Sequence, residues 1–372
     1  MKDPDGANLD CIQVIKGWVD AGGGHHERIV DVADLVHASA ERVMEKPNIF
    51  VSRALPAEVV DMLRRLFVVA DNPTDRALTA DDFAAAAAEC DGVLVTPSNR
   101  VDAALLARCP RLRVVSNIGV GYDHIDVAAC TARSVLVTNT PGVVDGATAD
   151  LTWALILAAC RRVVEADGYV RAGEWAKSPQ PFLGQQVHGA TLGVLGFGRI
   201  GQAVARRAAG FDMTVLYHQP RRAAPEVESA CKASFVGRDE LLQRSDILTL
   251  HMPYGPDTHH AIGAREIGLM KSTAVLVNAA RGGIVDDAAL IAALNRGAIA
   301  AAGLDVFESE PRLDAGYASL RNVVLTPHIG SATMATRVKM VQLAIGNLVA
   351  ALTGGAVPAP VNPEVLSQRM PA

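Results

Sequence analysis

Apolar and polar positions along this chain fall into two series of short strands and helices. From Pro47 onward, short β-branched runs predict strands, and the stretches between them have helical composition. In the first series the predicted strands are Asn48–Val51, Gly92–Thr96, Arg113–Ser116 and Val135–Thr138, and the predicted helices are Pro56–Leu66 and Ala80–Cys90. Strands that alternate with helices indicate right-handed βαβ units and a parallel sheet.

A long helix separates the two series. It is predicted from Asp145 to about Arg162, where apolar residues such as Leu151, Leu155 and Ala158 recur at helical spacing. The strands predicted in the second series are Thr191–Leu195, Thr214–Tyr217, Ile247–His251, Ala274–Asn278, Ala301–Asp305 and Val323–Thr326. The pattern therefore predicts an α/β fold with two doubly wound, parallel-sheet (Rossmann-like) domains.

The second series opens on a glycine-rich turn. Thr191–Leu195 is an apolar strand, and Gln202–Ala209 is alanine-rich and helix-forming. Between them Gly196, Gly198 and Gly201 have the spacing Gly-x-Gly-x-x-Gly. Such glycines permit a tight turn, a close approach of the backbone to a pyrophosphate, and close packing of helix on strand. Because free N–H groups of the first helical turn face the phosphates, this context predicts dinucleotide binding in the C-terminal domain.

The residues after the second strand of this series favour NADP(H) over NAD(H). In NAD-binding folds an acidic residue about 20 residues past the glycines accepts hydrogen bonds from the ribose 2′-hydroxyl. His218 occupies that position here, and Arg221 and Arg222 follow it. A carboxylate would repel a 2′-phosphate, whereas guanidinium groups bind phosphate well. The competing interpretation is that both arginines are solvated loop residues, which leaves NAD(H) as the alternative cofactor.

Residues 1–43 fit neither series and are predicted to be an N-terminal extension of unknown role. Gly22–Gly24 separates a short apolar piece around Ile12–Trp18 from an amphipathic stretch, Glu27–Val43. Met44 lies immediately before the first strand of the βαβ series. Met44 is therefore an alternative functional start, with the preceding residues appended.

Composition narrows the class of protein. A chain of 372 residues suggests about two domains, and 50% hydrophobic with 4% aromatic residues suits aliphatic parallel strands. A net charge of −5 gives no reason to expect a nucleic-acid partner. No apolar stretch reaches the roughly 18 residues of a membrane span, and no secretion signal is recognisable, so we expect a cytoplasmic protein. The scattered cysteines predict reduced thiols rather than disulfides or a metal site: Cys11, Cys90, Cys109, Cys130, Cys160 and Cys231.

Reactive side chains follow three strands of the second series, in residues 277–283, 303–311 and 326–331. Ligands of open α/β sheets bind at this carboxyl edge. Hydride reduction of a ketone leaves negative charge on oxygen and requires a proton donor, for which histidine is the usual choice. Arg281, Glu310 and His328 could supply a carboxylate-binding arginine, a partner carboxylate and that histidine. Spacing alone leaves three other candidates for the proton donor: His251, His259 and His260.

Several segments together resemble the D-isomer-specific 2-hydroxyacid dehydrogenase family, from residue 47 to about residue 362. The matching segments are Gly119–Asp126, Thr140–Gly142, Ala149–Ala154, the glycine-rich turn, Asn278–Gly282, Leu304–Pro311 and Pro327–Ala332. Within the family the chain is most similar to the glyoxylate/hydroxypyruvate reductase (2-ketogluconate reductase) branch. The resemblance implies NAD(P)H-dependent reduction of a small 2-oxo acid to the D-2-hydroxy acid. Glyoxylate, hydroxypyruvate and 2-ketogluconate stay open as substrates.

The resemblance also assigns roles to single residues. It implies that Arg281 binds and polarises the 2-oxo acid, that His328 is the acid/base, and that Glu310 pairs with the histidine. It implies too that backbone groups of Val120 and Gly121 bind the substrate carboxylate. The cofactor residues that it implies are Arg199 and Ile200 at the pyrophosphate, Pro253 and Thr258 along the adenosine side, Asp305 near the nicotinamide carboxamide, and Gly196, Gly198, Gly201, His218, Arg221, Arg222, Ala279, Arg281, His328 and Gly330.

In this family the substrate domain is discontinuous, and the active site lies in an interdomain cleft. The implied division is 47–144 with 328–362 for the substrate (catalytic) domain and 145–327 for the dinucleotide-binding domain. A C-terminal helix at about Thr333–Thr353 would complete the first of these. Family members are usually homodimers joined through the cofactor domains, and the helix 145–162 is a candidate contributor. Core packing within one subunit is the competing explanation for that helix.

Two alternatives and two departures accompany the resemblance. A nucleotide-sensing corepressor of the same fold can retain the same triad, so only turnover distinguishes it from an enzyme. A formate dehydrogenase-like enzyme would have glutamine in place of Glu310, which argues against it. The N-terminal extension and the segment after Trp175, which lacks a second tryptophan, depart from the family pattern.

The loop Arg53–Pro56 is a candidate for contacts with the substrate side chain.

Overall fold

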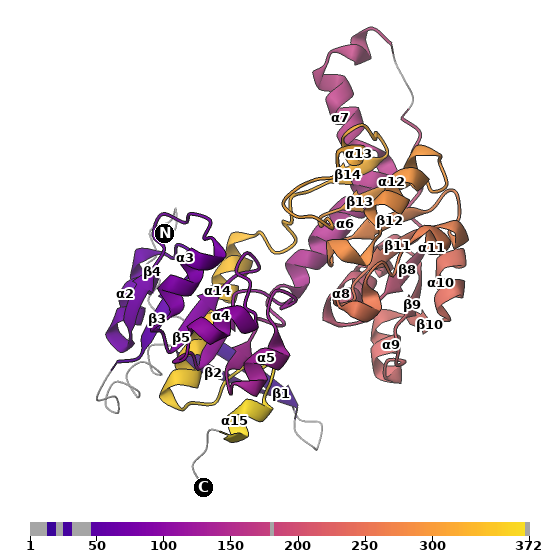
Figure 1. Ribbon diagram of the computed structural model, residues 1–372. Coiled ribbons are helices and arrows are strands. Elements are labelled where there is room, and N and C mark those ends of the chain that lie inside the picture. Colours follow the sequence, from indigo (N-terminus) through magenta and orange to yellow (C-terminus); the bar gives the residue numbers. More distant parts are fainter. Residues whose placement is uncertain (1–12, 20–24, 32–45, 179–181, 369–372) are drawn as a thin grey trace, which may run out of the picture. The chain divides into compact units, whose positions relative to one another are not determined.

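The computed structural model describes residues 13–19, 25–31, 46–178 and 182–368 (Figure 1). The chain divides into two compact units, one of residues 1–143 with 334–372 and one of residues 144–333. Each unit contains its own parallel sheet, which confirms the predicted α/β class with two Rossmann-like domains. Residues 328–333, predicted with the first domain, belong to the second unit.

The first unit is built on a five-stranded parallel sheet in the order β4-β3-β5-β6-β7. The strands are β3 (Asn48–Val51), β4 (Val68–Asp71), β5 (Gly92–Val95), β6 (Val114–Asn117) and β7 (Leu136–Thr138). The helices are α2 (Ala57–Leu66), α3 (Ala80–Ala87), α4 (Ala103–Arg108), α5 (Val127–Ala132), α14 (Met334–Thr353) and α15 (Glu364–Gln368). The inner strands are buried throughout because α3 and α4 pack on one face and α14 on the other.

The C-terminal segment completes this unit. The hydroxyl of Ser116 on β6 donates a hydrogen bond to the backbone O of Ala344 on α14 at 2.8 Å. Further along, Oδ1 of the buried Asn362 accepts a hydrogen bond from the N–H of Val137 on β7 at 2.7 Å. These bonds satisfy buried polar groups that the sheet alone leaves unpaired, so the last helices are part of this unit.

An antiparallel hairpin of β1 (Gln13–Val19) and β2 (His25–Asp31) precedes the first unit's sheet in sequence. The apolar piece predicted around Ile12–Trp18 overlaps β1. Most of the remaining expectations for residues 1–43, and Met44, lie outside the described residues. The predicted extension therefore includes a two-stranded sheet, and its role stays open.

The second unit is built on a seven-stranded parallel sheet in the order β10-β9-β8-β11-β12-β13-β14. Its strands are β8 (Thr191–Leu195), β9 (Thr214–His218), β10 (Ala233–Phe235), β11 (Ile247–Leu250), β12 (Val275–Asn278), β13 (Ala301–Leu304) and β14 (Val323–Leu325). The helices are α6 (Asp145–Arg161), α7 (Val163–Arg171), α8 (Arg199–Ala208), α9 (Pro225–Cys231), α10 (Arg238–Arg244), α11 (Ala264–Leu269), α12 (Asp287–Asn295) and α13 (Ala315–Ala318). Short 3₁₀ turns are η1 (Glu174–Ala176), η2 (Ala209–Phe211), η3 (Pro256–Thr258) and η4 (Gly282–Ile284).

Two apolar cores lie on the two faces of this sheet. Val194 packs in the core shared with α6 and α8, and the next residue, Leu195, packs in the core shared with α10, α11 and α12. Successive strand residues point to opposite faces, so an uninterrupted apolar strand fills both cores. The sheet order reverses at β8, next to β11, and ligands of doubly wound sheets bind at such a switch point.

Within the two βαβ series, two strands were not predicted and several element ends differ from the prediction. β4 and β10 are short edge strands, and β4 is half-exposed, so neither produces a buried apolar run. The helix predicted to end at Cys90 ends at Ala87, and the long helix ends at Arg161, where Arg162 adopts φ = 54°. Element ends are fixed by local hydrogen bonds rather than by periodicity, which explains these differences.

The described cysteines form no disulfide bonds with one another. Cys90, Cys109, Cys130, Cys160 and Cys231 are free and buried, whereas Cys11 lies outside the described residues. Burial raises the pKa of the Cys130 and Cys160 thiols to about 12, which makes them unreactive near neutral pH. Among the described helices, none has the length and apolar character needed to cross a bilayer.

Candidate active site

His328 lies on the loop that follows β14. Its backbone has φ = 53°, a left-handed conformation that is uncommon for histidine, and its N–H donates to the backbone O of Asp305 at 2.8 Å. The buried Asp305 carboxylate accepts the N–H groups of Ile329 and Gly330, at 2.8 Å each, and the hydroxyl of Thr326 at 2.6 Å. These bonds bend the loop around Asp305 and fix the position from which the histidine side chain projects.

The imidazole of His328 pairs with the carboxylate of Glu310. Nδ1 lies 2.7 Å from Oε2, and the N–H of Phe307 donates to Oε1 at 2.8 Å. Burial raises the pKa of Glu310, but the hydrogen bond to His328 and the positive charges nearby outweigh it, so the pKa lies below its ordinary 4.5. An ionised carboxylate only accepts hydrogen bonds, so Nδ1 carries the hydrogen and Nε2 is left for a substrate.

Arg281 follows β12 on a turn that packs against the segment carrying Glu310. The buried Asn278 holds this turn, because its Nδ2 donates to the backbone O of Arg281 at 2.8 Å. Gly282 permits the close approach, since a Cβ there would lie 1.9 Å from the carbonyl carbon of Phe307. The guanidinium charge of Arg281 helps to lower the pKa of Glu310. The structure therefore brings the three predicted reactive side chains together within the second unit.

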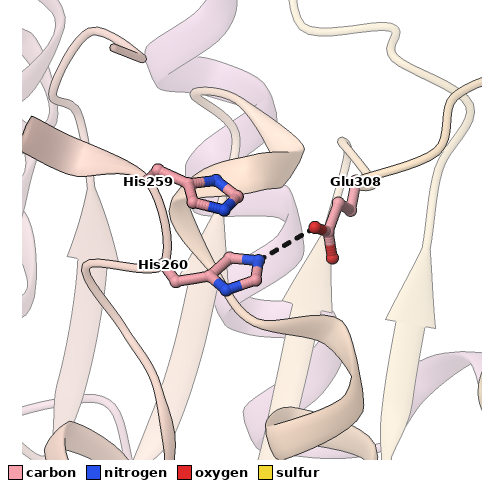
Figure 2. A group of neighbouring side chains, drawn as sticks. All are labelled: His259, His260 and Glu308. Carbon is pink, nitrogen blue, oxygen red and sulfur yellow. Dashed lines mark hydrogen bonds and ion pairs between the residues drawn. The ribbon is translucent and has the colours of Figure 1, made fainter. Parts of the chain in front are cut away.

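The three rival histidines have other surroundings. Nε2 of His251 lies 2.9 Å from Oγ1 of Thr249, and burial lowers the pKa of His251 to about 3. This imidazole is therefore neutral near pH 7 and unsuited to donate a proton. Nε2 of His260 lies 2.9 Å from Oε1 of Glu308, and its ring stacks on that of His259 with centroids 3.8 Å apart (Figure 2).

The glycine-rich turn fits a dinucleotide pyrophosphate. Gly196 has φ = 92°, and a Cβ there would lie 2.6 Å from the backbone that follows β11. A Cβ at Gly201 would lie 2.3 Å from the backbone O of Gly196, so both glycines are required by packing. A Cβ at Gly198, in contrast, would meet nothing within 4 Å of the described chain. That open position lies at the start of α8, whose first two residues are the predicted Arg199 and Ile200.

The chain after β9 turns back onto these glycines. Oε1 of Gln219 accepts the N–H of Phe197, inside the glycine-rich turn, at 3.1 Å. Nδ1 of His218 lies 2.9 Å from the backbone O of Val236. His218 therefore lies at the end of the second strand as predicted, and Gln219 ties that strand end to the turn.

The two predicted phosphate-binding arginines differ in their contacts. Nε and Nη2 of Arg222 donate to the two oxygens of Glu228 at 2.9 Å each, and the Tyr217 hydroxyl donates to the same carboxylate at 2.5 Å. The bonds from Arg222 and then Tyr217 lower the pKa of Glu228 to about 2. Arg221 is exposed and has no hydrogen bond or ion pair with any residue that the structure describes. One guanidinium is thus held in place and the other is unpaired.

The other predicted cofactor residues lie in the same unit. The hydroxyl of Thr258 donates to the backbone O of Pro253 at 2.8 Å and closes the loop after β11. Ala279 is buried at the start of the Arg281 turn. The N–H of Gly330 donates a hydrogen bond to Asp305 and so helps to hold the loop that carries His328.

Val120 and Gly121 lie in the first unit, on the loop after β6. Nδ2 of Asn117 donates to the carbonyls of Gly119 and Gly121 at 3.0 and 2.9 Å, and Nδ2 of Asn139 donates to that of Val120 at 2.8 Å. Within the described chain no residue accepts the N–H groups of Val120 or Gly121. Adjacent unpaired N–H groups of this kind form a binding site for an anion such as a carboxylate.

Sequence reasoning missed the amide side chains that hold these loops: Asn117, Asn139, Gln219 and Asn278. Each lies at the end of a buried strand or directly after it. An amide at that position is a usable signal, because it must find hydrogen-bond partners and the adjoining loop supplies them.

Replacing Gly282 with alanine should destabilise the second unit. The added Cβ would overlap backbone atoms of Phe307, and overpacking of this kind costs about 1–3 kcal/mol. Gly268→Ala on α11 is the matched control, because its Cβ meets nothing within 4 Å and alanine favours helix. Thermal unfolding should show a Tm several degrees lower for Gly282→Ala alone. Equal Tm values for the two variants would mean that the turn does not need this close approach.

Comparisons with known proteins identify the family of the chain. The model of the D-isomer specific 2-hydroxyacid dehydrogenase NAD binding domain matches residues 153–330, and that of a family of unknown function (DUF3604) matches residues 1–52. A glyoxylate reductase of Thermococcus gammatolerans is 47% identical over 331 residues, which cover 88% of this chain and 99% of the relative. A glyoxylate/hydroxypyruvate reductase B of Citrobacter koseri is 47% identical over 323 residues, with coverages of 86% and 99%.

Solved structures show the same similarity. A glyoxylate reductase from Paecilomyes thermophila has a TM-score of 0.79 at 32% identity, and covers 86% of this chain and 100% of its own. An NADPH-dependent glyoxylate/hydroxypyruvate reductase from Sinorhizobium meliloti, in complex with NADP and malonate, has a TM-score of 0.76 at 33% identity, with coverages of 88% and 100%. The chain therefore belongs to the D-isomer-specific 2-hydroxyacid dehydrogenase family and is an NAD(P)-dependent D-2-hydroxyacid dehydrogenase.

Proposed function

We propose that this enzyme reduces glyoxylate to glycolate and hydroxypyruvate to D-glycerate. The observation that carries the proposal is the pairing of His328 with Glu310 beside the Arg281 turn, at the carboxyl edge of the dinucleotide-binding sheet. The two relatives at 47% identity are named as reductases of these substrates, which supports turnover over the corepressor-like alternative. The glutamate at position 310 also separates the chain from formate dehydrogenase-like enzymes.

The side chains divide the chemistry between them. The guanidinium of Arg281 binds and polarises the 2-oxo acid. Nε2 of His328 donates the proton that neutralises the developing alkoxide. Glu310 accepts the hydrogen of Nδ1 and stabilises the doubly protonated ring, which donates its Nε2 proton in reduction and forms again in the reverse reaction. The reduced nicotinamide, when bound, supplies the hydride.

The substrate carboxylate is assigned to the N–H groups of Val120 and Gly121. Asn117 and Asn139 support this role, because their amides hold the carbonyls of the loop and keep the N–H groups unpaired. Two backbone donors bind the carboxylate common to all 2-oxo acids and do not select the side chain. The interdomain cleft, the domain boundaries and the cytoplasmic location expected from the sequence stay predictions.

A panel of 2-oxo acids with NADPH and NADH tests this function. The wild-type enzyme should reduce glyoxylate and hydroxypyruvate, with 2-ketogluconate as the third substrate tested. His328→Ala should lower kcat by about 10²–10⁴-fold, the usual effect of losing a general acid. Arg281→Lys should also lose turnover, because an ammonium group lacks the planar, two-pronged donor geometry of a guanidinium. His188→Ala, an exposed histidine beside Asp212, is the control and should retain turnover.

Two outcomes of this panel would reject the proposal. Wild-type-like turnover in His328→Ala would remove the histidine from the reaction. Absence of NAD(P)H oxidation with every 2-oxo acid would favour a nucleotide-binding regulator instead.

NADP(H) is the cofactor that the residues after β9 favour. A 2′-phosphate carries negative charge, and both Arg221 and Arg222 follow the strand end where an NAD-specific fold places a carboxylate. Two of the donors on Arg222 are already bound to Glu228, whereas those of Arg221 have no partner in the described chain. Arg221 should therefore contribute more of the binding free energy for the phosphate.

Kinetics with both cofactors test this assignment. Arg221→Ala should raise the KM for NADPH about tenfold or more, the effect of losing one charge-assisted hydrogen bond of roughly 1.5–3 kcal/mol, and leave the KM for NADH nearly unchanged. Arg222→Ala should have a smaller effect, and Arg296→Ala, an exposed arginine after α12, should have none. A wild-type preference for NADH would refute the assignment.

A homodimer formed through the second unit explains an apolar surface near α7. In the described chain no residue of α7 is buried, and the helix projects from the sheet layers of its own unit (Figure 1). Exposed large apolar side chains are concentrated here: Val163, Val164, Val170, Trp175 and Leu183. A hollow of about 410 Å³ beside them is lined in part by Val164, Leu183 and Val323. Exposed apolar patches of this kind mark protein interfaces. Most of α6, in contrast, packs in the core of its own unit.

Sedimentation velocity tests the dimer. The wild-type chain should sediment as a dimer. The double variant Val164→Asp/Leu183→Asp should shift the equilibrium toward the monomer, because dimerisation would bury the introduced charges at the interface. Val68→Asp, at an exposed valine of the first unit, is the control. A wild-type chain that sediments as a monomer would contradict the proposal.

A further inference from the structure

Two loops of the second unit bring three metal-ligating side chains together. His259 and His260 follow η3, and Glu308 lies in the segment after β13. One ligand atom from each residue lies within 4.8 Å of the others. Figure 2 shows the His260 imidazole directed at the Glu308 carboxylate, with the His259 ring stacked beside it.

The backbone holds both loops in this arrangement. His260 has φ = 50°, and its N–H donates to the backbone O of Gly283 at 2.8 Å. On the other side the N–H of Glu308 donates to Oδ2 of Asp287 at 3.1 Å. Side chains of consecutive residues in an extended chain point in opposite directions. The left-handed conformation of His260 therefore allows both imidazoles to lie on one side.

The donor set suits a late first-row divalent cation. Two imidazoles and one carboxylate are characteristic ligands of Zn²⁺, with a fourth position for water. Nε2 of His260 and Oε1 of Glu308 are 2.9 Å apart, a hydrogen-bond distance, so a bound ion replaces the hydrogen between them and separates the two atoms to the roughly 3.4 Å of a tetrahedral zinc ion. The surroundings are acidic as well, because the buried carboxylate of Asp287 lies beside Glu308 and accepts its N–H.

We propose that His259, His260 and Glu308 form a binding site for a divalent cation of the Zn²⁺ class. Because the two imidazole rings are stacked, their nitrogen lone pairs do not point at one common position. The exposed His259 ring must therefore rotate toward the ion. In doing so it gives up its 3.2 Å hydrogen bond to the Tyr254 hydroxyl and forms a bond to the metal. The bound ion ties the loop after η3 to the segment that carries Glu310, two residues beyond Glu308. The site is independent of the proposed substrate.

Isothermal titration of the full chain, stripped of metal with a chelator, with ZnCl₂ tests the site. The wild-type chain should bind one ion. His259→Ala and Glu308→Gln should each weaken binding by more than the roughly 10- to 100-fold that loss of an outer-shell partner costs. His188→Ala is the matched control, an exposed histidine beside Asp212 in the same unit, and should bind as the wild type does. Far-UV circular dichroism confirms that each variant is folded.

Three results would overturn the proposal. One is the absence of zinc binding by the wild-type chain. Another is equal affinity in His259→Ala and wild type. The third is loss of binding in His328→Ala with binding kept in His259→Ala, which would place the ion on the acid/base pair. Because the readout is binding of the metal alone, it is separate from the 2-oxo acid panel.

Discussion

Nδ1 of His328 lies 2.7 Å from Oε2 of Glu310, and this contact leaves Nε2 as the ring nitrogen for the proton transfer that we propose. The carboxylate is a pure acceptor as long as it is ionised, and its lowered pKa keeps it so across the neutral range. Its second oxygen is occupied by the N–H of Phe307, so the group cannot rotate away. The imidazole is consequently oriented before any ligand binds. Such preorganisation favours catalysis, because no free energy of reorganisation is needed during the reaction.

The pair depends in turn on two backbone constraints in neighbouring loops. Asp305 is buried and accepts three donors from the loop of His328, which accounts for the unusual left-handed backbone at that histidine. Gly282 lets the Arg281 turn press against the segment of Glu310. Three strand ends, of β12, β13 and β14, are adjacent in the sheet, and they bring together side chains that are far apart in the sequence.

The sequence predicted the parts of this arrangement that have a periodic or spaced signal. Inner strands are continuous apolar runs, and the glycine spacing marks a turn, so both were predicted. The edge strands β4 and β10 are partly exposed and have no continuous buried run, so they were not predicted. Arg281, Glu310 and His328 carry no mutual spacing, and only the family resemblance selected them from other arginines and histidines. The lowered pKa of His251 and the hydrogen bond that the Gln219 side chain accepts both depend on tertiary contacts, which no local sequence pattern encodes.

Two imidazole–carboxylate pairs share one short segment, and their surroundings give them opposite electrostatic character. Glu310 with His328 lies near the guanidinium of Arg281, whose charge stabilises anions, as a 2-oxo acid requires. The backbone N–H of Glu308 donates to the buried Asp287 carboxylate, so a further acidic group lies beside Glu308 and His260, a surrounding that favours a cation. In the two proposals the same two functional groups take different ligands because the third charge differs, and in an α/β sheet that charge is set by which strand end lies next to the segment.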